Sequence, residues 1–531
     1  MISGLEKIIK LYKKNRKRNF KILVFLVLSI SIFFRIWWGM QKQGLHLDEV
    51  LSVMAANYNT NDAGIIHDQF YAGKELKNKI FINDPSFRDA ILDIKTLYIS
   101  NYDTPHTNFY YSLLRLSFIG RMAVDIKDII YTGIILNCLF FIIEFFFLFK
   151  LLKLLFEKRE DLILTALFCI GTAGSSLSNT LFLRPYQLQA MMFVIFSYYL
   201  FDTIINKKYN LKRVMSLSFI TAFTLLSGYF SIIFIGLNIV AVGVYLFTIK
   251  NIKNILYIVL SMILGSFLAQ LLYLKYWQTV LFGEDRAGEA YAKLNSSYFF
   301  SNIIKVSDTL YEFLSNYTVY FLPVFLIILI LGIICQNRKM KEVEIIRLIL
   351  VFVSGLFSFV AIWLAPIKVI RYIIPALPLF MILIPSSIYF IKNRNYKILL
   401  IFFTIFFYFI NAFEVNKINY LFESKKTEHV FLGNTKEPVY LLSNADYRFL
   451  EWIPYGYNKQ RYIFFDNLNN LDTTFAKNNK KRAYLVLDGM LNKDQTDQFL
   501  IKLMERYNIE EEIITPADDV VGFKVLKLNI K

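Results

Sequence analysis

The sequence predicts a polytopic α-helical membrane protein, with about 11 transmembrane helices and a small extracytoplasmic α/β domain at the C-terminal end. Two observations support this fold class. Hydrophobic residues make up 56% of the 531 residues, whereas soluble domains are about 45–50% apolar. Apolar stretches of about 20 residues, the length that an α-helix needs to cross a bilayer, also recur along the chain.

The apolar stretches define the expected domain organisation. Residues 1–19 form a basic cytoplasmic N-terminus, residues 20–415 a transmembrane domain and residues 416–531 an extracytoplasmic α/β domain. No small-residue cleavage site follows the first stretch, so we expect it to remain as the first helix. The expected spans lie near residues 20–40, 129–156, 161–181, 185–206, 212–228, 229–249, 253–275, 319–335, 345–364, 368–390 and 396–414.

Basic loops predict the orientation of these spans. Cytoplasmic loops of membrane proteins carry an excess of Lys and Arg. The basic connections alternate with less basic ones and lie at residues 150–161, 206–213, 250–254, 336–347 and 392–397. The N-terminus is therefore expected in the cytoplasm and the C-terminal domain outside it, in the periplasm if the protein lies in a cell inner membrane.

The charge of the chain has the same explanation. A formal net charge of +18 is also found in nucleic-acid-binding proteins. Here the basic residues gather in loops between apolar spans, and no Gly-rich phosphate loop or nucleic-acid motif accompanies them. We therefore expect the lipid bilayer, and no nucleic acid, as a partner.

Two long loops are expected on the outer face, at residues 41–128 and 276–318. The first contains "TPHTNFYYSLLRLSFIG" (104–120), which Arg115 interrupts, so we expect a helix lying in the membrane interface. The second either covers a substrate site or forms a solvated interfacial helix. Its polar residues are Glu284, Asp285, Arg286 and Glu289.

After residue 415 the pattern changes to short β-rich runs alternating with helical stretches. This alternation predicts a small α/β domain. The strands are expected at residues 439–443, 461–466, 482–488 and 523–530, and a helix at residues 494–507.

Two adjacent carboxylates, Asp48 and Glu49 in "GLHLDEVLS", directly follow the first span. Acidic groups at the depth of the membrane interface are partly desolvated and costly. The pair is either a solvated loop pair or helix cap, or part of a reactive site. His46 either tunes the ionisation of Asp48, contacts a sugar or is an ordinary loop histidine.

Cations are expected near the same level, at the outer ends of two other spans. "LFLRPYQLQ" contains Arg184, and "PIKVIRYIIPALP" contains Lys368 and Arg371. Together with the carboxylates they form a cluster that can hold an anionic lipid and activate an acceptor. The alternative is that these arginines extend to lipid headgroups and that Tyr372 belongs to the interfacial aromatic belt. Arg35, inside the first span, is expected to extend outward in this way.

Asp103 and His106 in "NYDTPHTNFYY" are, with His46, the candidates for a metal or substrate contact in the first loop. Both residue types are acceptable ligands of a divalent metal. The chain has only 4 His and no His-x-x-x-His spacing, which favours a structural hydrogen bond. We therefore predict no cofactor, with a divalent metal as the less favoured alternative.

Four segments resemble, in matching order, the C-type (GT-C) membrane glycosyltransferase superfamily, in particular protein O-mannosyltransferases and aminoarabinose transferases. "LHLDEVLS" resembles the Asp-Glu motif of the first outer loop. "DTPHTNFYYSLLRL" resembles a His-Pro-Pro-Leu-Tyr-Tyr-type segment, although Thr107 and Asn108 depart from that pattern. "LRPYQLQAMMFVIFSYYLF" resembles an Arg-x-Tyr segment and "RYIIPALPLFMIL" an Arg-Tyr-x-x-Pro segment.

The resemblance implies transfer of a sugar from a polyprenyl-phosphate carrier to an acceptor, with inversion at the anomeric carbon. Asp48 would be the general base, and Glu49 would orient Asp48 or a sugar hydroxyl. Arg184, Lys368, Arg371 and Tyr372 would bind the donor phosphate. The acceptor stays open among a glycolipid, a glycan and a protein.

Two other functions remain as alternatives. A transporter of a lipid-linked sugar should show repeat symmetry and charges near the bilayer midplane, and the sequence shows neither clearly. A ligase or polymerase of surface polysaccharide would use a diphosphate-linked donor, which the same cations could bind.

Overall fold

A computed structural model shows that the chain forms two compact units. The helical unit comprises Met1–Gln41, Thr104–Tyr110 and Ile134–Asn419, and the mixed unit comprises Lys42–Asp103, Tyr111–Gly133 and Tyr420–Lys531. The structure describes residues 16–57, 69–101, 106–122, 126–282, 288, 299–336, 338–365, 367–421, 437–443, 450, 461–465, 482–488, 491–515 and 523–530.

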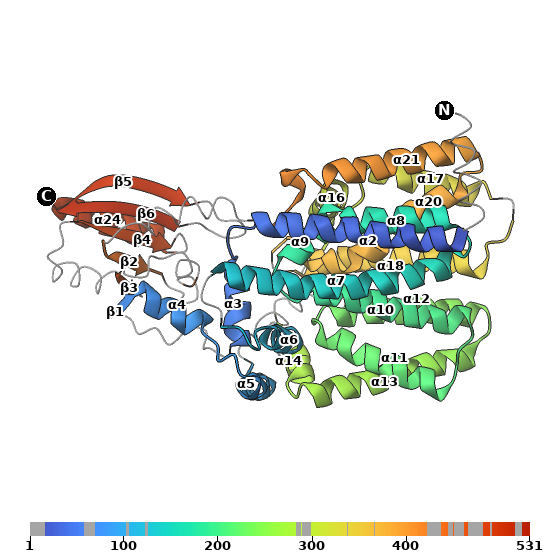
Figure 1. Ribbon diagram of the computed structural model, residues 1–531, viewed down its shortest axis with the longest axis horizontal. Coiled ribbons are helices and arrows are strands. Elements are labelled where there is room, and N and C mark those ends of the chain that lie inside the picture. The colour runs from blue at the N-terminus through green and yellow to red at the C-terminus, as the bar shows by residue number, and fades with distance from the viewer. Residues whose placement is uncertain are drawn as a thin grey trace. The chain divides into compact units, whose positions relative to one another are not determined.

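The helical unit consists of long helices that run side by side (Figure 1). Two helices belong to both units: α6 (Phe109–Ser117) ends in the mixed unit, and α7 (Ile126–Phe156) begins there. The other elements of the helical unit are α2 (Arg16–Gln41), α8 (Glu160–Thr172), α9 (Gly174–Leu181), α10 (Tyr186–Ile205), α11 (Leu211–Leu226), α12 (Ser231–Thr248), α13 (Ile252–Leu272), α14 (Tyr276–Phe282), α16 (Phe299–Tyr317), α17 (Leu322–Ile334), α18 (Glu342–Leu364), α19 (Leu377–Phe380), α20 (Leu383–Phe390), α21 (Arg394–Asn411) and the 3-10 helices η1 (Ile370–Tyr372), η2 (Ile374–Ala376) and η3 (Val415–Lys417).

The helices that are long and apolar enough to cross a membrane make this a membrane protein. Among the described residues they number 6, namely α2, α7, α10, α12, α13 and α18, or up to 8 if two bent pairs are each one span. The expected count of about 11 is therefore not confirmed. The stretch 212–228 forms the 16-residue helix α11, and the stretch 368–390 is divided into short helices because prolines interrupt it.

The bent pair α8–α9 turns by 47° at Ala173. Glycines next to this bend allow close approach of other segments. A Cβ atom at Gly171 would collide with the Ser31 hydroxyl, and one at Gly174 would collide with the Lys417 carbonyl. The bend therefore brings the backbone of this span against α2 and the segment after α21.

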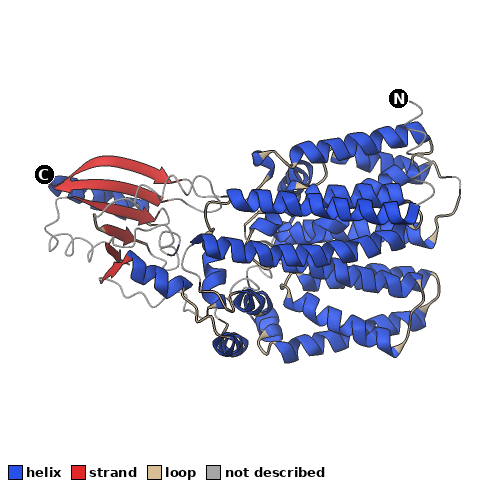
Figure 2. Ribbon diagram, viewed as in Figure 1, coloured by secondary structure: helices blue, strands red, loops and turns tan. Residues whose placement is uncertain are grey.

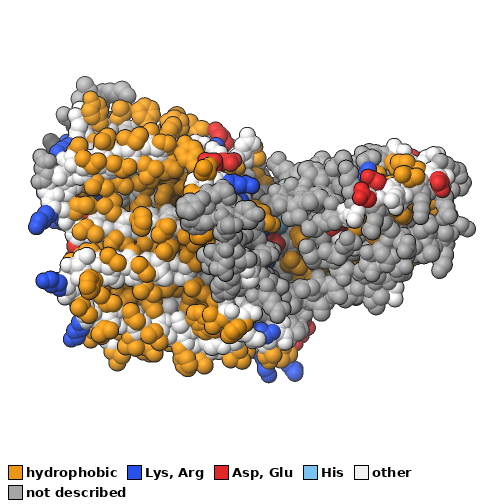
Figure 3. All heavy atoms as spheres, turned by 180° about the vertical axis from the view of Figure 1, so that it is seen from behind, with side chains coloured by type: hydrophobic (Ala, Val, Ile, Leu, Met, Phe, Trp, Pro, Cys, Tyr) orange, Lys and Arg blue, Asp and Glu red, His pale blue; other side chains and the backbone are white. Residues whose placement is uncertain are grey.

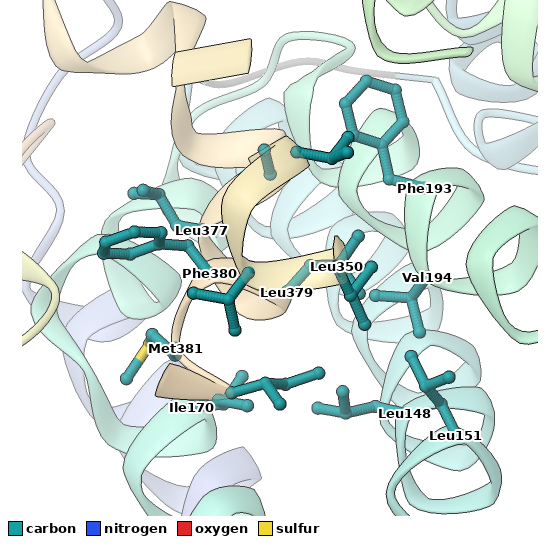
Figure 4. Packing of buried hydrophobic residues seen from close by; sticks show 14 of the residues in the cluster. Leu148, Leu151, Ile170, Phe193, Val194, Leu350, Leu377, Leu379, Phe380 and Met381 are labelled. Atoms are coloured by element: carbon teal, nitrogen blue, oxygen red, sulfur yellow. The ribbon is translucent and has the colours of Figure 1, made fainter. Parts of the chain in front are cut away.

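The core of the helical unit is made of aromatic and aliphatic side chains from many helices. The Phe193 ring of α10 stacks on the Phe234 ring at 3.9 Å and meets the edge of Phe357 at 5.3 Å. Figure 4 shows part of this packing, including Met381 and its neighbours from α19. The short helices after residue 370 are thus embedded in the core rather than exposed as loops.

The basic connections gather at one end of the helical unit. The connections α7–α8, α10–α11, α12–α13 and α20–α21 lie at the same end (Figure 1). Contacts join them there: the Arg159 guanidinium lies 6.0 Å from the Tyr389 ring centroid, and the Tyr209 and Tyr257 rings are 6.2 Å apart. Figure 3 shows Lys and Arg side chains at this end and hydrophobic side chains over the adjoining face.

The mixed unit contains a six-stranded sheet with strand order β1-β3-β2-β4-β6-β5, drawn in red in Figure 2. The strands β3, β2 and β4 are parallel neighbours, and the other pairs are antiparallel. The elements of this unit are α3 (Leu47–Ala56), β1 (Phe70–Ala72), α4 (Gly73–Phe81), α5 (Phe87–Ser100), β2 (Val439–Leu442), β3 (Arg461–Phe465), β4 (Arg482–Asp488), α24 (Lys493–Arg506), β5 (Tyr507–Thr515) and β6 (Phe523–Ile530).

Four of the six strands and the helix α24 lie where the sequence predicts them, which confirms a small C-terminal sheet. Two strands were not predicted. One is β5, and the other is β1, which comes from the first loop and pairs with β3 in the register Tyr71↔Tyr462. The first loop therefore supplies an edge strand to the C-terminal sheet.

The pairing of β1 with β3 is tested by a disulfide between Tyr71→Cys and Tyr462→Cys, in a chain whose native cysteines are replaced by serine. Directly opposed residues of an antiparallel pair have Cα atoms about 4.5–5.5 Å apart, within the range of about 4.4–6.8 Å that a disulfide requires. Mass spectrometry after oxidation should find the linked peptides in most molecules.

The matched control pairs Tyr71→Cys with Phe464→Cys, two residues further along β3. Diagonal neighbours are about 7–8 Å apart, so this pair should link poorly. Equal linking of both pairs, or no linking of the first, would refute the register.

Candidate active site

The acidic turn, residues 46–49, begins helix α3. His46 is the N-cap of this helix, and its ring Nδ1 accepts a hydrogen bond from the Asp48 backbone N–H at 3.1 Å. The Glu49 carboxylate accepts one from the His46 backbone N–H at 2.7 Å. Two backbone donors at the start of the helix are thus satisfied by side chains, which is the arrangement of a capping box.

Glu49 also forms an ion pair with Lys42 that the sequence analysis missed. The Lys42 ammonium lies 3.1 Å from the Glu49 carboxylate, and both side chains are 0% exposed. Lys42 further donates to the Tyr420 carbonyl at 2.7 Å, and the Gln43 backbone N–H donates to the Leu421 carbonyl at 2.9 Å. The acidic turn is therefore fixed to the segment that follows the helical unit. The only feature of the sequence that could have indicated this ion pair is a lysine seven residues before Glu49.

Asp48 differs from Glu49 in its access to solvent. Its side chain is 24% exposed, and its carboxylate lies 3.6 Å from His46 Nδ1. Because Glu49 is enclosed by Lys42 and a backbone donor, Asp48 is the carboxylate of this pair that an incoming molecule can reach. A carboxylate held in this way can accept a proton from a hydroxyl group.

A second group of candidate residues, the arginine turn, lies in the helical unit at residues 182–186. Arg184 is buried in the connection between α9 and α10, and its Nη2 atom lies 3.0 Å from both ring nitrogens of His106. The structure therefore brings His106 and Arg184 together. The His106 ring, which the sequence offered as a possible metal or substrate contact, thus contacts the guanidinium of Arg184.

Arg371, in the 3-10 helix η1, approaches the same turn. Its guanidinium carbon lies 6.0 Å from the centroid of the Phe182 ring and 5.6 Å from that of Tyr372. The Tyr372 ring packs against Tyr186 with centroids 6.3 Å apart, in an edge-on geometry. Two buried arginines thus lie beside one aromatic-lined turn, where their charges interact more strongly with an anion than they would in water.

Lys368 has a different environment from the two arginines. Its ammonium donates to the carbonyls of Ile362, Trp363 and Ala365, at 2.6, 3.0 and 3.2 Å. These are carbonyls at the C-terminal end of α18, where a cation satisfies backbone acceptors and interacts favourably with the helix dipole. Its geometry favours a role in holding the segment that leads to Arg371.

One residue of the predicted site, Asp103, lies outside the described residues. The polar residues of the second loop, which is predicted to cover a substrate site or to form an interfacial helix, also lie outside them: Glu284, Asp285, Arg286 and Glu289. Within the described part of the chain, no group of three His, Cys, Asp or Glu side chains could hold a metal ion. Thr107, which departs from the family pattern, donates its hydroxyl hydrogen to the Leu226 carbonyl at the end of α11.

The expectation that Arg35 extends outward to the membrane surface is wrong. Its side chain is 0% exposed and donates to the Gly171 carbonyl at 2.7 Å and to the Ser176 hydroxyl at 2.6 Å. Its guanidinium carbon lies 3.2 Å from the centroid of the Phe141 ring. The bent pair α8–α9 supplies these acceptors, and its bend was not predicted from the sequence.

Comparison with solved structures identifies the fold. ArnT from Cupriavidus metallidurans bound to undecaprenyl phosphate matches with a TM-score of 0.50 and 9% identity, over 95% of this chain and 97% of that chain. Its apo state matches with a TM-score of 0.50 and 10% identity over the same shares. The archaeal oligosaccharyltransferase AglB from Archaeoglobus fulgidus matches with a TM-score of 0.47 and 12% identity, over 96% of this chain and 74% of that chain.

The chain therefore has the fold of these ArnT structures, which it matches over nearly its whole length. The fold that the motif resemblance implies is thereby confirmed. No protein-family model and no curated protein matches the sequence.

The buried ion pair of the acidic turn is tested by a double-mutant cycle with Lys42→Met and Glu49→Leu. Each single substitution leaves one charge buried without its partner and should cost about 3–5 kcal/mol of unfolding free energy. The double variant should cost much less than the sum, because neither charge remains. The free energy of unfolding of the two single variants and the double variant is measured in detergent micelles.

The control cycle uses the exposed pair Arg159 and Asp161, whose guanidinium and carboxylate are 2.6 Å apart. Exposed pairs contribute about 0–1 kcal/mol, so alanine at either position should have little effect. Additive costs for Lys42 and Glu49 would contradict a coupled buried pair.

Proposed function

We propose that this protein is an inverting glycosyltransferase that moves a sugar from a polyprenyl-phosphate carrier to a glycolipid, glycan or protein acceptor. The observation that carries the proposal is the arginine turn, where Arg184 and Arg371 are buried beside aromatic rings. The fold supports it, because the similar ArnT structure was determined with undecaprenyl phosphate bound.

On the donor side, the arginines would hold the phosphate that leaves. As the acceptor oxygen bonds to the anomeric carbon, the bond from that carbon to the phosphate oxygen breaks and the electron pair stays on the phosphate. The second pKa of a phosphate monoester is about 6, so fixed cations can stabilise the leaving group without a strong acid. Arg184 and Arg371 suit this role because a guanidinium can bond two phosphate oxygens at once.

On the acceptor side, Asp48 would take the proton of the attacking hydroxyl. A neutral hydroxyl is a weak nucleophile, and a positioned carboxylate that removes its proton contributes typically about 10²–10⁴-fold in rate. Glu49, enclosed with Lys42, would act on Asp48 by fixing the first turn of α3. Tyr372 would line the phosphate site, and Lys368 would hold the segment that carries Arg371.

We also propose that the protein lies in the inner membrane with its N-terminus in the cytoplasm. The basic connections that gather at one end of the helical unit support this orientation. In this orientation the first loop and residues 416–531 are extracytoplasmic. The strand β1, which the first loop adds to the C-terminal sheet, is consistent with both lying on one side of the membrane.

The proposal is tested by comparing Asp48→Asn with Arg371→Ala in lipid nanodiscs. Asp48→Asn should lower transfer from a labelled undecaprenyl-phosphate sugar by at least about 10²-fold while binding undecaprenyl phosphate as the wild type does. Arg371→Ala should bind the carrier at least about tenfold more weakly, since one charge-assisted bond to the phosphate contributes more than 1.4 kcal/mol.

The matched control is Arg394→Ala, an exposed arginine at the start of α21. Full transfer activity in Asp48→Asn would refute the base assignment. Carrier binding that Arg371→Ala leaves unchanged, or that Arg394→Ala weakens equally, would refute the phosphate site.

A further inference from the structure

The arginine turn is short, so the position of the Arg184 guanidinium depends on how its two ends are held. The turn connects α9, which ends at Leu181, to α10, which begins at Tyr186. Inside it, the Arg184 backbone N–H donates to the Phe182 carbonyl at 2.8 Å. Pro185 follows directly and is the N-cap of α10.

Side chains from α7 bind both ends of this turn. The Asn137 amide donates to the Thr180 carbonyl at 3.1 Å and to the Phe182 carbonyl at 2.9 Å. On the other side of Arg184, the Gln187 amide donates to the Glu144 carboxylate at 2.6 Å. All these side chains are buried in the helical unit.

A continuous chain of hydrogen bonds joins Arg35 to Glu144 through the same turn. Arg35 Nε donates to the Thr180 hydroxyl at 3.0 Å. That hydroxyl lies 3.1 Å from Gln187 Oε1, to which it donates. The Gln187 amide then donates to Glu144. The Thr180 hydroxyl has a second acceptor, the Ser176 carbonyl at 3.4 Å, and the shorter distance favours its donation to Gln187. We call these four residues the buried relay; they come from α2, α9, α10 and α7.

The two ends of the buried relay carry opposite charges in an apolar bundle. Arg35 is 0% exposed and Glu144 2% exposed. A buried charge is tolerated only when it is paired and hydrogen-bonded, and ionisable residues inside membrane segments are rare and usually functional. Buried polar groups are costly to leave unsatisfied, so the relay restricts the arrangements that its members can adopt.

We propose that Arg35 and Glu144 are positioning residues, which hold the arginine turn so that Arg184 meets the phosphate of the carrier lipid. This inference rests on the proposed function, because it assigns the relay to the donor site. Thr180 and Gln187 lie four residues before and three residues after Arg184, so the relay binds the chain on both sides of that arginine. This role explains why a basic and an acidic side chain are buried in the bundle next to the bent pair α8–α9.

The test uses Thr180→Val, which removes the hydroxyl link and leaves both charges in place, because removing Arg35 or Glu144 risks a general loss of folding. The matched control is Thr221→Val in α11, where the buried hydroxyl contacts only the Met262 sulfur in the described structure, at 3.3 Å. Binding of undecaprenyl phosphate and donor kinetics are measured for both variants in nanodiscs, with thermal unfolding alongside.

Thr180→Val should raise the Kd of undecaprenyl phosphate and the donor KM by roughly tenfold, since small displacements of a binding group are costly. Its kcat should fall as well, because the proposed function places Arg184 on the leaving phosphate, and Thr221→Val should change neither the Kd nor the kinetics. Weaker binding of the carrier together with an unchanged thermal unfolding midpoint is not expected from a general loss of stability.

Unchanged donor KM and Kd in Thr180→Val, or equal changes in Thr221→Val, would overturn the inference. If Arg371→Ala weakens carrier binding while Thr180→Val does not, the positioning role fails and the proposed function stands. If the wild type binds no polyprenyl phosphate, the proposed function fails and this inference fails with it.

Discussion

Charge buried in an apolar bundle is the constraint on which the arrangement of the candidate site depends. Arg35, Arg184 and Arg371 are all buried in the helical unit. Leaving such a charge without compensation costs several kcal/mol, so each guanidinium fixes the groups around it. Arg35 fixes the bent pair α8–α9 and, through Thr180, the turn that carries Arg184. The bend of a membrane helix and the geometry of the proposed phosphate site are therefore parts of one network.

The same reasoning explains why the acidic turn has two adjacent carboxylates. Glu49 is enclosed by Lys42 and a backbone donor, so its charge is used to fix the start of α3. Asp48, one residue earlier, points to a more accessible environment beside His46. Different surroundings give neighbouring carboxylates different roles. The pair thus combines a rigid anchor with a group that is able to exchange a proton.

Apolar stretches and alternating strands were predictable from the sequence because they depend on local patterns. Helices occur within the predicted spans, and four strands occur at the predicted β-rich runs. Both follow from local patterns of apolar residues, because a helix or a strand must bury an apolar face. Pairings between distant segments were not predictable. The three-residue strand β1 has no local signal apart from its partner, and the Lys42–Glu49 pair joins residues that no motif connects. The burial of Arg35 depends on the bend at Ala173, because the bent pair supplies its acceptors. The spacing of apolar residues does not predict this bend.

The measurement that tests the central claim most directly is the identity of the lipid released by the wild-type protein in nanodiscs. Undecaprenyl-monophosphate and undecaprenyl-diphosphate sugars, labelled in the sugar, are supplied with candidate acceptors, and the lipid product is identified by mass spectrometry. The account predicts consumption of a monophosphate donor, release of undecaprenyl phosphate and a transferred sugar of inverted anomeric configuration. Release of undecaprenyl diphosphate, with no turnover of any monophosphate donor, would contradict it and assign the buried arginines to a diphosphate-linked polysaccharide ligase.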